Sequence, residues 1–314
     1  MYYPYFRGKQ FELITMRESA SLFKTAGFVP IIEPVQESLS GLKRTLVALK
    51  DAKAEVVLIV NPFHGNHAGD ASDIQDLVEA ELRDHANVSV GIALRQSMSA
   101  ADATKLHAAY SGNPRTFVHA GFTAAANLAV SLGNEALESR HVFFEECCGK
   151  LYRKHFKGAE RVLLRDGFKK RTSNREYPPL ESFSDLHATF GEEGMDGFGD
   201  FLMVGDDYSE SGGPAYAVVI HLTCIDPAKD DEMFIHHFKS DRHDTPTDPA
   251  GKFAEALKKL VAEVNRSGTS IARTAAVEEF LDLQKRRHFP GLGYVKKLSM
   301  AHHIETLALY LRKG

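Results

Sequence analysis

Residues 88–119 contain two apolar runs separated by a helical pattern, and this stretch decides the fold. The first run reads VSVGIALR (88–95), and the second reads TFVH (116–119). Each run is continuous rather than alternating, which is typical of parallel strands buried on both faces. Between them, Ser99 is a suitable N-cap for a helix over 99–110. The stretch therefore predicts a strand–helix–strand unit whose two strands lie parallel.

The same alternation extends in both directions along the chain. The apolar runs predict strands at 28–32, 56–60, 88–94, 116–118, 142–144, 162–164, 201–204 and 216–224. Helical patterns are expected at 10–24, 41–53, 72–86, 99–110, 123–132 and 151–156. Eight such units match an α/β fold of the (β/α)8 TIM-like barrel type. An open doubly wound sheet is the alternative, but the first predicted strand ends in Glu33-Pro34-Val35 and lacks the glycine-rich turn of that fold.

The predicted domain organisation is a single barrel domain over residues 1–314, with its core at about 28–224. An N-terminal helix precedes the core, and a polar loop covers residues 167–179. A C-terminal hairpin and helical region follows over 225–314, in which the strand at 233–238 pairs back on the strand at 216–224 as a β-hairpin insertion. C-terminal helices are expected at 252–264, 271–287 and 298–312.

Composition excludes several classes of protein. The chain has 314 residues, of which 43% are hydrophobic and 25% charged, so it resembles neither a disordered nor a coiled-coil protein. Its net charge of −4 argues against direct nucleic-acid binding. No apolar run approaches the ~20 residues that span a membrane, and the first residues lack the pattern of a signal peptide. Three cysteines, two of them adjacent at Cys147 and Cys148, favour a reducing, cytoplasmic location.

Polar residues of reactive type follow the predicted strands. In chain order they are Glu33, Asn61, Arg95, His119, Glu145, Arg165 and Asp206, with His221 inside the last strand. The carboxyl ends of barrel strands meet at one mouth, where the catalytic residues of barrel enzymes lie. We therefore take four of these residues as candidate catalytic groups, namely Glu33, His119, Glu145 and His221. The candidate substrate-binding groups are Asn61, Arg95, Arg165 and Asp206.

Structural roles compete with this interpretation, because most strands end in a polar residue. Arg95 is equally suited to a structural ion pair with Glu33 or Glu145. The basic loop at Lys169–Arg175, set beside Arg95 and Arg165, suits a phosphate group but also suits plain solvation. The segment with Arg7, Lys9 and Glu12 either covers the bottom of the barrel or joins its mouth.

The sequence predicts no metal site and identifies no cofactor. His64 and His67, with Asp70 nearby, would need a third ligand in a curled loop to hold zinc. The acidic loop at Asp206-Asp207 suits either a divalent cation or a turn. The pairs His236-His237 and His302-His303 point to opposite faces or lie on solvated surfaces, so they are poor ligand pairs.

Four short segments resemble a known family. The opening YPYFRGKQFEL (3–13) with PIIEP (30–34), and GDF (199–201) with GDDY (205–208), are similar to the bacteriophage beta-protein family and its bacterial relatives. The resemblance extends over the whole chain. It implies a barrel-like α/β protein of a prokaryote or phage, a role in phage defence, and a nuclease-like protein as partner. It supplies no catalytic residues.

Two functions follow as hypotheses. The first is a hydrolase or lyase acting on an anionic, phosphate-containing small molecule or nucleotide. The arginines would hold the anion, His119 or His221 would serve as general acid or base, and Glu33 or Glu145 would orient an imidazole or act as base. The second is a non-catalytic binding module that partners a nuclease-like protein through the C-terminal additions. The strand-end residues favour the enzyme.

Overall fold

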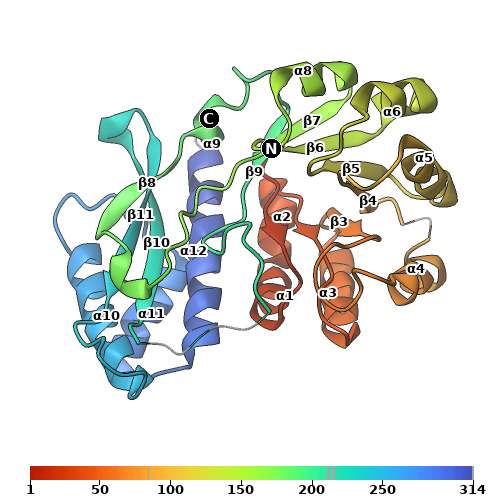
Figure 1. Ribbon diagram of the computed structural model, residues 1–314. Helices are drawn as coiled ribbons and strands as arrows, with labels where there is room; N and C mark the ends of the chain where they lie inside the picture. The colour runs from red at the N-terminus through yellow and green to blue at the C-terminus, as the bar shows by residue number, and fades with distance from the viewer. Residues whose placement is uncertain (84, 211–212, 214–215, 313–314) are drawn as a thin grey trace. The chain divides into compact units, whose positions relative to one another are not determined.

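The chain forms two compact units in the computed structural model, which describes residues 1–83, 85–210, 213 and 216–312 (Figure 1). The barrel unit comprises Met1–Arg165 and Thr189–Phe201, and the second unit comprises Asp166–Ala188 and Leu202–Gly314. We had expected one barrel domain with C-terminal additions. Both units are discontinuous in sequence, because the chain passes from one to the other at 165/166, 188/189 and 201/202.

The barrel unit contains a nearly closed sheet of eight parallel strands, which confirms the TIM-like α/β prediction. Its order is β1-β2-β3-β4-β5-β6-β7-β9. The strands are β1 (Tyr5–Phe6), β2 (Ile31–Ile32), β3 (Val56–Ile59), β4 (Val88–Leu94), β5 (Arg115–His119), β6 (Arg140–Phe144), β7 (Glu160–Leu164) and β9 (Gly197–Gly199). The amide of Tyr3 donates to the carbonyl of Phe198 at 2.8 Å, and this backbone pairing joins the two edges of the sheet.

Helices surround these strands, as Figure 1 shows from α1 to α8. They are α1 (Gln10–Glu18), α2 (Ala20–Ala26), α3 (Ser40–Asp51), α4 (Ser72–Leu77) with a π-helical turn at Val78–Leu82, α5 (Ala100–Ala109), α6 (Ala125–Leu132), α7 (Glu135–Glu138) and α8 (Lys150–Arg153), followed by a 3-10 turn at Lys154–Phe156. Ser99 caps α5 as predicted, with Asp102 completing a capping box. Side chains from all eight strand regions fill the barrel interior, including Tyr5, Ile31, Val57 and Val118.

Glycine makes the closure of the barrel sterically feasible. A Cβ on Gly199 would lie 2.1 Å from the backbone oxygen of Tyr3, which is far inside van der Waals contact. The missing side chain therefore lets β9 approach the first strand closely.

Two of the predicted barrel strands were wrong. Residues 201–204 form no strand, and the strand at 216–224 belongs to a different, antiparallel sheet. Their places in the barrel are taken by β9 and by the N-terminal β1, where Tyr3 and Tyr5 point into the core. Strand β1 was missed because it has only two residues and because Pro4, which cannot donate a backbone hydrogen bond, directly precedes it.

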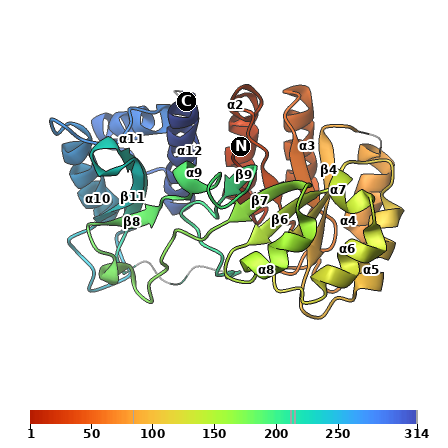
Figure 2. The same cartoon turned by 90° about the horizontal axis from the view of Figure 1, so that it is seen from above.

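The second unit is built on a three-stranded antiparallel sheet in the order β10-β11-β8. The strands are β10 (Val219–Asp226), β11 (Glu232–Lys239) and β8 (Leu180–Ser184), with α9 (Leu186–Thr189) after β8 and 3-10 turns at Asn174–Glu176 and Pro227–Lys229. The predicted hairpin is confirmed, with Val219 opposite Lys239. Helices α10 (Pro249–Val264), α11 (Ala275–Arg286) and α12 (Leu292–Leu311) pack with the hairpin in one apolar core (Figure 2).

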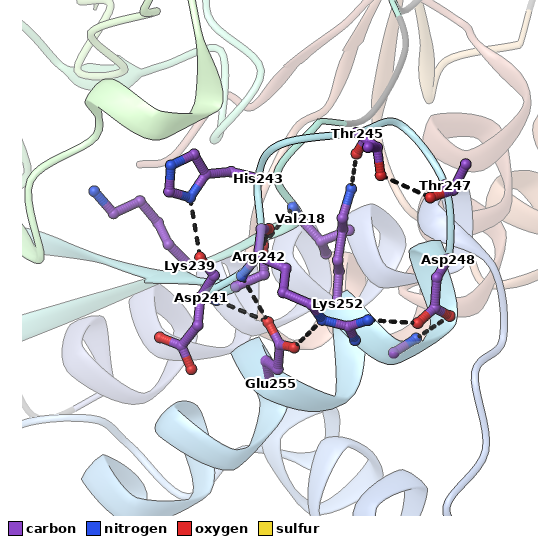
Figure 3. A network of polar contacts seen from close by, with 12 residues as sticks. Val218, Lys239, Asp241, Arg242, His243, Thr245, Thr247, Asp248, Lys252 and Glu255 are labelled. Atoms are coloured by element: carbon purple, nitrogen blue, oxygen red, sulfur yellow. Dashed lines mark hydrogen bonds and ion pairs between the residues drawn. The ribbon is translucent and has the colours of Figure 1, made fainter.

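A polar loop over residues 240–248 connects β11 to α10 (Figure 3). Arg242 bridges Asp248 and Glu255, and Asp248 also accepts a hydrogen bond from the amide of Gly251 at the start of α10. Lys252 donates to the carbonyl of Thr245 from within the helix. These contacts are local and fix the entry into α10, so we assign the cluster a structural role.

None of the helices in the described part of the chain combines the length and apolar character that crossing a bilayer requires.

Candidate functional site

Glu33 is the centre of a polar network at the carboxyl end of the barrel strands. Its side chain is completely buried directly after β2. The hydroxyl of Tyr5 and the Nε of Arg7 donate to Oε2 at 2.9 and 3.2 Å. The backbone amides of Phe63 and His64 donate to Oε1 at 2.8 and 3.2 Å, and His64 Nδ1 lies 3.0 Å from the same atom.

These donors keep Glu33 ionised. Burial alone would raise its pKa, but the hydrogen bonds from His64 and Phe63 and the charge of Arg7 outweigh burial and lower the pKa to about 2. A carboxylate with so low a pKa is a poor proton acceptor near neutral pH. The geometry therefore makes Glu33 a positioning residue that holds Arg7 and His64. Orienting an imidazole was one of the two roles expected of it, and acting as a general base was the other.

The loop after β3 brings His64 to Glu33. This loop passes so close to the segment that follows β2 that a Cβ on Gly65 would lie 2.0 Å from the carbonyl oxygen of Val35. Gly65 also has a φ of +74°, which glycine adopts without strain. His64 retains 25% side-chain exposure, whereas its partner Glu33 has none.

Positive charge gathers at the same end of the barrel. The guanidinium of Arg95, which follows β4, lies over the ring of Phe63. Arg7 and Arg95 both act electrostatically on the buried Tyr5 hydroxyl, lowering its pKa against the larger effect of burial. One expected structural role of Arg95 was an ion pair with Glu33. Arg95 lies near Glu33, but the residue that forms the ion pair with Glu33 is Arg7.

Two more of the predicted residues form a pair at the ends of β6 and β7. Arg165 donates from Nε and Nη2 to the two carboxylate oxygens of Glu145, at 2.5 and 2.9 Å. Both side chains are about one third exposed. Asn61, after β3, uses both ends of its amide on the backbone of Ala93, at 2.9 and 2.8 Å, and so links β3 to β4.

His119 does not face the mouth, although it ends β5. Its neighbour Val118 fills the barrel interior, so the His119 side chain points outward toward the helices. There it is fully buried, with Nδ1 2.7 Å from the Tyr152 hydroxyl and Nε2 2.9 Å from His141 Nδ1. Burial and the neighbouring His141 lower its pKa well below the usual value. His119 is a hydrogen-bonded core residue.

The remaining two candidates, Asp206 and His221, belong to the second unit. The amide of Asp206 donates to Asp166 Oδ2 at 2.8 Å, which fixes the loop that carries it. His221 lies on β10 and lines a pocket of about 590 Å³ formed by residues of the second unit. The strand-end pattern thus brings Glu33, Asn61, Arg95, Glu145 and Arg165 to the barrel end. It leaves His119 in the core, and Asp206 and His221 in the second unit.

A chain of ionisable side chains leads into that pocket. Glu181 on β8 accepts from Arg171 at 2.6 Å and lies 3.0 Å from His237 Nε2. His237 Nδ1 on β11 lies 2.7 Å from His221 Nδ1. Burial lowers the pKa of His237 to about 4, despite its bond to Glu181. The sequence interpretation of His236-His237 and His302-His303 as solvated pairs was wrong for His237, His302 and His303, which are all buried.

No metal ligand set is evident in the described ranges, where no three His, Cys, Asp or Glu side chains are grouped to hold an ion. His64 contacts Glu33 through Nδ1, and His67 Nε2 lies 3.0 Å from the carbonyl oxygen of Gln36, so these two rings serve different partners. Ser211 and Gly212, which extend the acidic loop after Asp206, lie outside the described residues.

Sequence reasoning missed Tyr5, His64, Glu181 and His237 as members of these networks. Arg7 was left open, and it joins the strand end because β1 precedes it. The alternation of buried aromatics at Tyr3 and Tyr5 was the available signal for β1. The hairpin that carries His221 and His237 was predicted, but its register was not, and the register places the two rings side by side.

No family model, curated protein or solved structure matches the chain. The resemblance to the beta-protein family therefore stays a prediction, and the geometry alone must support a function.

Proposed function

We propose that the barrel unit is a hydrolase or lyase that acts on an anionic, phosphate-containing small molecule or nucleotide at the carboxyl ends of its strands. The contact between Glu33 and His64 carries this proposal. A buried, ionised carboxylate accepts hydrogen bonds and donates none, so His64 Nδ1 bears a proton, and in the neutral ring the lone pair is on Nε2. A carboxylate that orients an imidazole in this way is a recurring arrangement in general acid–base catalysis.

The arginines supply the expected substrate charge preference. Arg7 and Arg95 lie near Tyr5 and Glu33, and Arg165 follows β7 at the same end of the barrel. Guanidinium groups bind phosphate through paired hydrogen bonds, and barrel enzymes hold phosphates at this end. Arg95 and Arg165 are thus retained as substrate-binding groups, while His64 takes the acid–base role that we had expected of His119 or His221.

Binding is tested first. A panel of nucleotides and phosphorylated metabolites is screened by thermal shift on the wild type and on Arg95→Ala. We expect at least one phosphorylated compound to raise Tm of the wild type and to lose that effect in Arg95→Ala. A panel without any stabilising anion, or an equal response of both proteins, would remove the basis of the proposal.

Turnover is tested on the compounds that bind. In His64→Asn the new amide still donates to Glu33 but lacks the basic Nε2, so we expect kcat to fall about 10²- to 10⁴-fold. His155→Asn, at an exposed histidine of the same unit, is the matched control and should retain the wild-type rate. Equal rates in the two variants would exclude His64 as the acid–base group.

The cytoplasmic location, the role in phage defence and the nuclease-like protein partner are part of the same proposal and rest on composition and resemblance. Co-purification from the native host would test the partner. A stable complex with no turnover on any phosphorylated compound would favour the non-catalytic binding module.

A further inference from the structure

The pocket of the second unit is independent of the barrel end and has the make-up of a ligand site. Its volume of about 590 Å³ lies in the range of small-molecule pockets. Aromatic and aliphatic side chains, among them Phe168, Tyr177 and Val295, form much of its wall. Lys296, Ser299 and Asn174 contribute polar groups to the same wall. Apolar walls with a few convergent polar groups are the usual composition of such sites.

The proton positions in the Glu181–His237–His221 chain follow from its partners. Glu181 accepts from Arg171 and faces His237 Nε2, so that nitrogen carries the proton. His237 is uncharged near pH 7, because its pKa is about 4, and its Nδ1 is therefore an acceptor. His221 must then donate from Nδ1 to His237 across their 2.7 Å contact.

This arrangement leaves the lone pair of His221 on Nε2. The rings of Phe168 and Tyr177 meet His221 edge to face, with centroids 5.1 and 4.9 Å away, and hold the imidazole in place. Among the residues that the structure describes, no group bonds to Nε2. The pocket thus presents an oriented hydrogen-bond acceptor, and the ring edges beside it are apolar.

A cation lies close to this acceptor. Lys296, on α12, lines the pocket and its positive charge acts on His221. Lys170 also lines the pocket and pairs with Asp207 at 2.7 Å. Because the charge of Lys296 is the one that reaches His221, an anionic group of a ligand beside the acceptor is best matched by Lys296, and a planar ring by the aromatic wall.

We propose that this pocket is a second ligand site, which binds a small organic anion with a planar aromatic ring, of the size of a nucleoside monophosphate. Lys296 binds the anionic group, Phe168 and Tyr177 contact the ring, and His221 Nε2 accepts a hydrogen bond from a hydroxyl or N–H donor of the ligand. Glu181 and His237 act as positioning residues that fix the tautomer of His221.

The test uses AMP and UMP, with adenosine and inorganic phosphate as partial ligands, and a fluorescent reporter. The chain has no tryptophan, so Tyr216→Trp places a single indole on the pocket wall at an exposed position. We expect saturable changes in its emission with at least one of the two monophosphates. Adenosine and phosphate alone should bind at least about 10-fold more weakly, because each lacks one half of the contacts.

Variants in the Tyr216→Trp background assign the contacts. Lys296→Met and His221→Asn should each weaken binding about 10-fold or more. Asparagine at 221 retains a donor toward His237 and removes the Nε2 acceptor. Lys258→Met, at an exposed lysine outside the pocket, is the charge-matched control and should bind as the parent does.

Arg95→Ala separates the two proposals. Binding at the second site should be unchanged in Arg95→Ala, because that residue belongs to the barrel end. An absence of any response to both monophosphates, in a parent whose circular dichroism matches wild type, would overturn the proposal. Equal affinities for the Lys296→Met, His221→Asn and Lys258→Met variants would overturn it as well.

Discussion

The buried carboxylate of Glu33 is stable only while its donors surround it, and this makes its contribution depend on pH. The pKa of Glu33 is about 2 in the folded protein and near 4.5 when unfolded. The lowered pKa therefore stabilises the fold above pH 4.5, and that stabilisation is lost as the pH falls from about 4.5 to 2. The shift corresponds to about 3 kcal/mol.

We predict that Glu33→Gln lowers the free energy of unfolding at pH 7 by about 3 kcal/mol, because it leaves Arg7 and two backbone amides without their ionic acceptor. Urea denaturation at pH 7 measures this change. Glu37→Gln, at an exposed residue of the following loop, is the control and should be neutral. Equal stabilities of the two variants would contradict the central role of Glu33.

The buried histidines give a second loss of stability at low pH, which arises from burial of neutral rings rather than from hydrogen bonds to a charged group. His119 and His141 have lowered pKa values, about 4 for His141, because burial disfavours the charged rings. In the unfolded chain they titrate near 6.5, so unfolding takes up protons below that pH. Their neutral state thus contributes full stability above pH 6.5, and stability falls as the pH is lowered toward 4.

We predict that Tm falls between pH 7 and 4.5 in the wild type and falls less steeply in His119→Gln, which removes one titrating ring. Thermal unfolding at a series of pH values measures both slopes. At pH 7 the variant should itself be less stable by about 1–3 kcal/mol, because Tyr152 and His141 lose their partner. An unchanged slope would show that His119 does not titrate on unfolding.

At the scale of single elements, the pairing of strand β9 depends on the missing side chain of Gly199. We predict that Gly199→Ala destabilises the barrel by about 2–4 kcal/mol, because its Cβ would meet the backbone of Tyr3 and separate β9 from the first strand. Chemical denaturation measures the loss. Gly191→Ala is the matched control, since a Cβ there meets no atom within 4 Å. A neutral Gly199→Ala would mean that the two edges of the sheet tolerate separation.

The elements also show what the sequence can and cannot predict. Strands β4 to β7 and helix α5 were predicted because their apolar runs and caps are local properties of the chain. The strands β1 and β9 were missed because they have only two and three residues, too few for a recognisable apolar run. They are strands through their pairing with β2 and β7, and the bridge between Tyr2 and Phe198 that joins them spans most of the barrel unit. For the site, Glu33, Arg95, Glu145 and Arg165 were found from their position after a strand. Position after a strand does not say which way a side chain points, and this is why His119 was misassigned.

Antiparallel register explains the other gap. His221 was identified as a reactive residue, but it was assigned to the barrel because strand 216–224 continues the earlier rhythm. Its contact with His237 requires the pairing of β10 with β11, and Glu181 enters through β8, about 40 residues earlier in the chain. The hairpin itself was predicted, but a single sequence contains no local signal for its register or for β8 as the third strand.

At the scale of the whole molecule, the two units share one chain that passes between them repeatedly. A fragment of residues 1–201 keeps all eight barrel strands but leaves β8 without its partner β11. We predict that this fragment aggregates, because an unpaired strand exposes hydrogen-bonding groups and apolar side chains. Solubility after expression and light scattering measure this.

The matched control for that fragment replaces residues 167–187 with a glycine–serine linker and so removes β8. It should be soluble and show helix and strand signals in circular dichroism. If both fragments behave alike, β8 is not what limits the isolated barrel.

The pairing of the first strand with β9 has a consequence for the order of events during synthesis. The amino group of Met1 contacts the carbonyl of Asp196, 195 positions away along the chain. A ribosome must therefore add 195 residues after Met1 before the opening strand finds its neighbour on that side, and the growing edge stays exposed for many seconds at ordinary elongation rates. During that time, chaperones that bind unpaired strand edges can act on the growing chain.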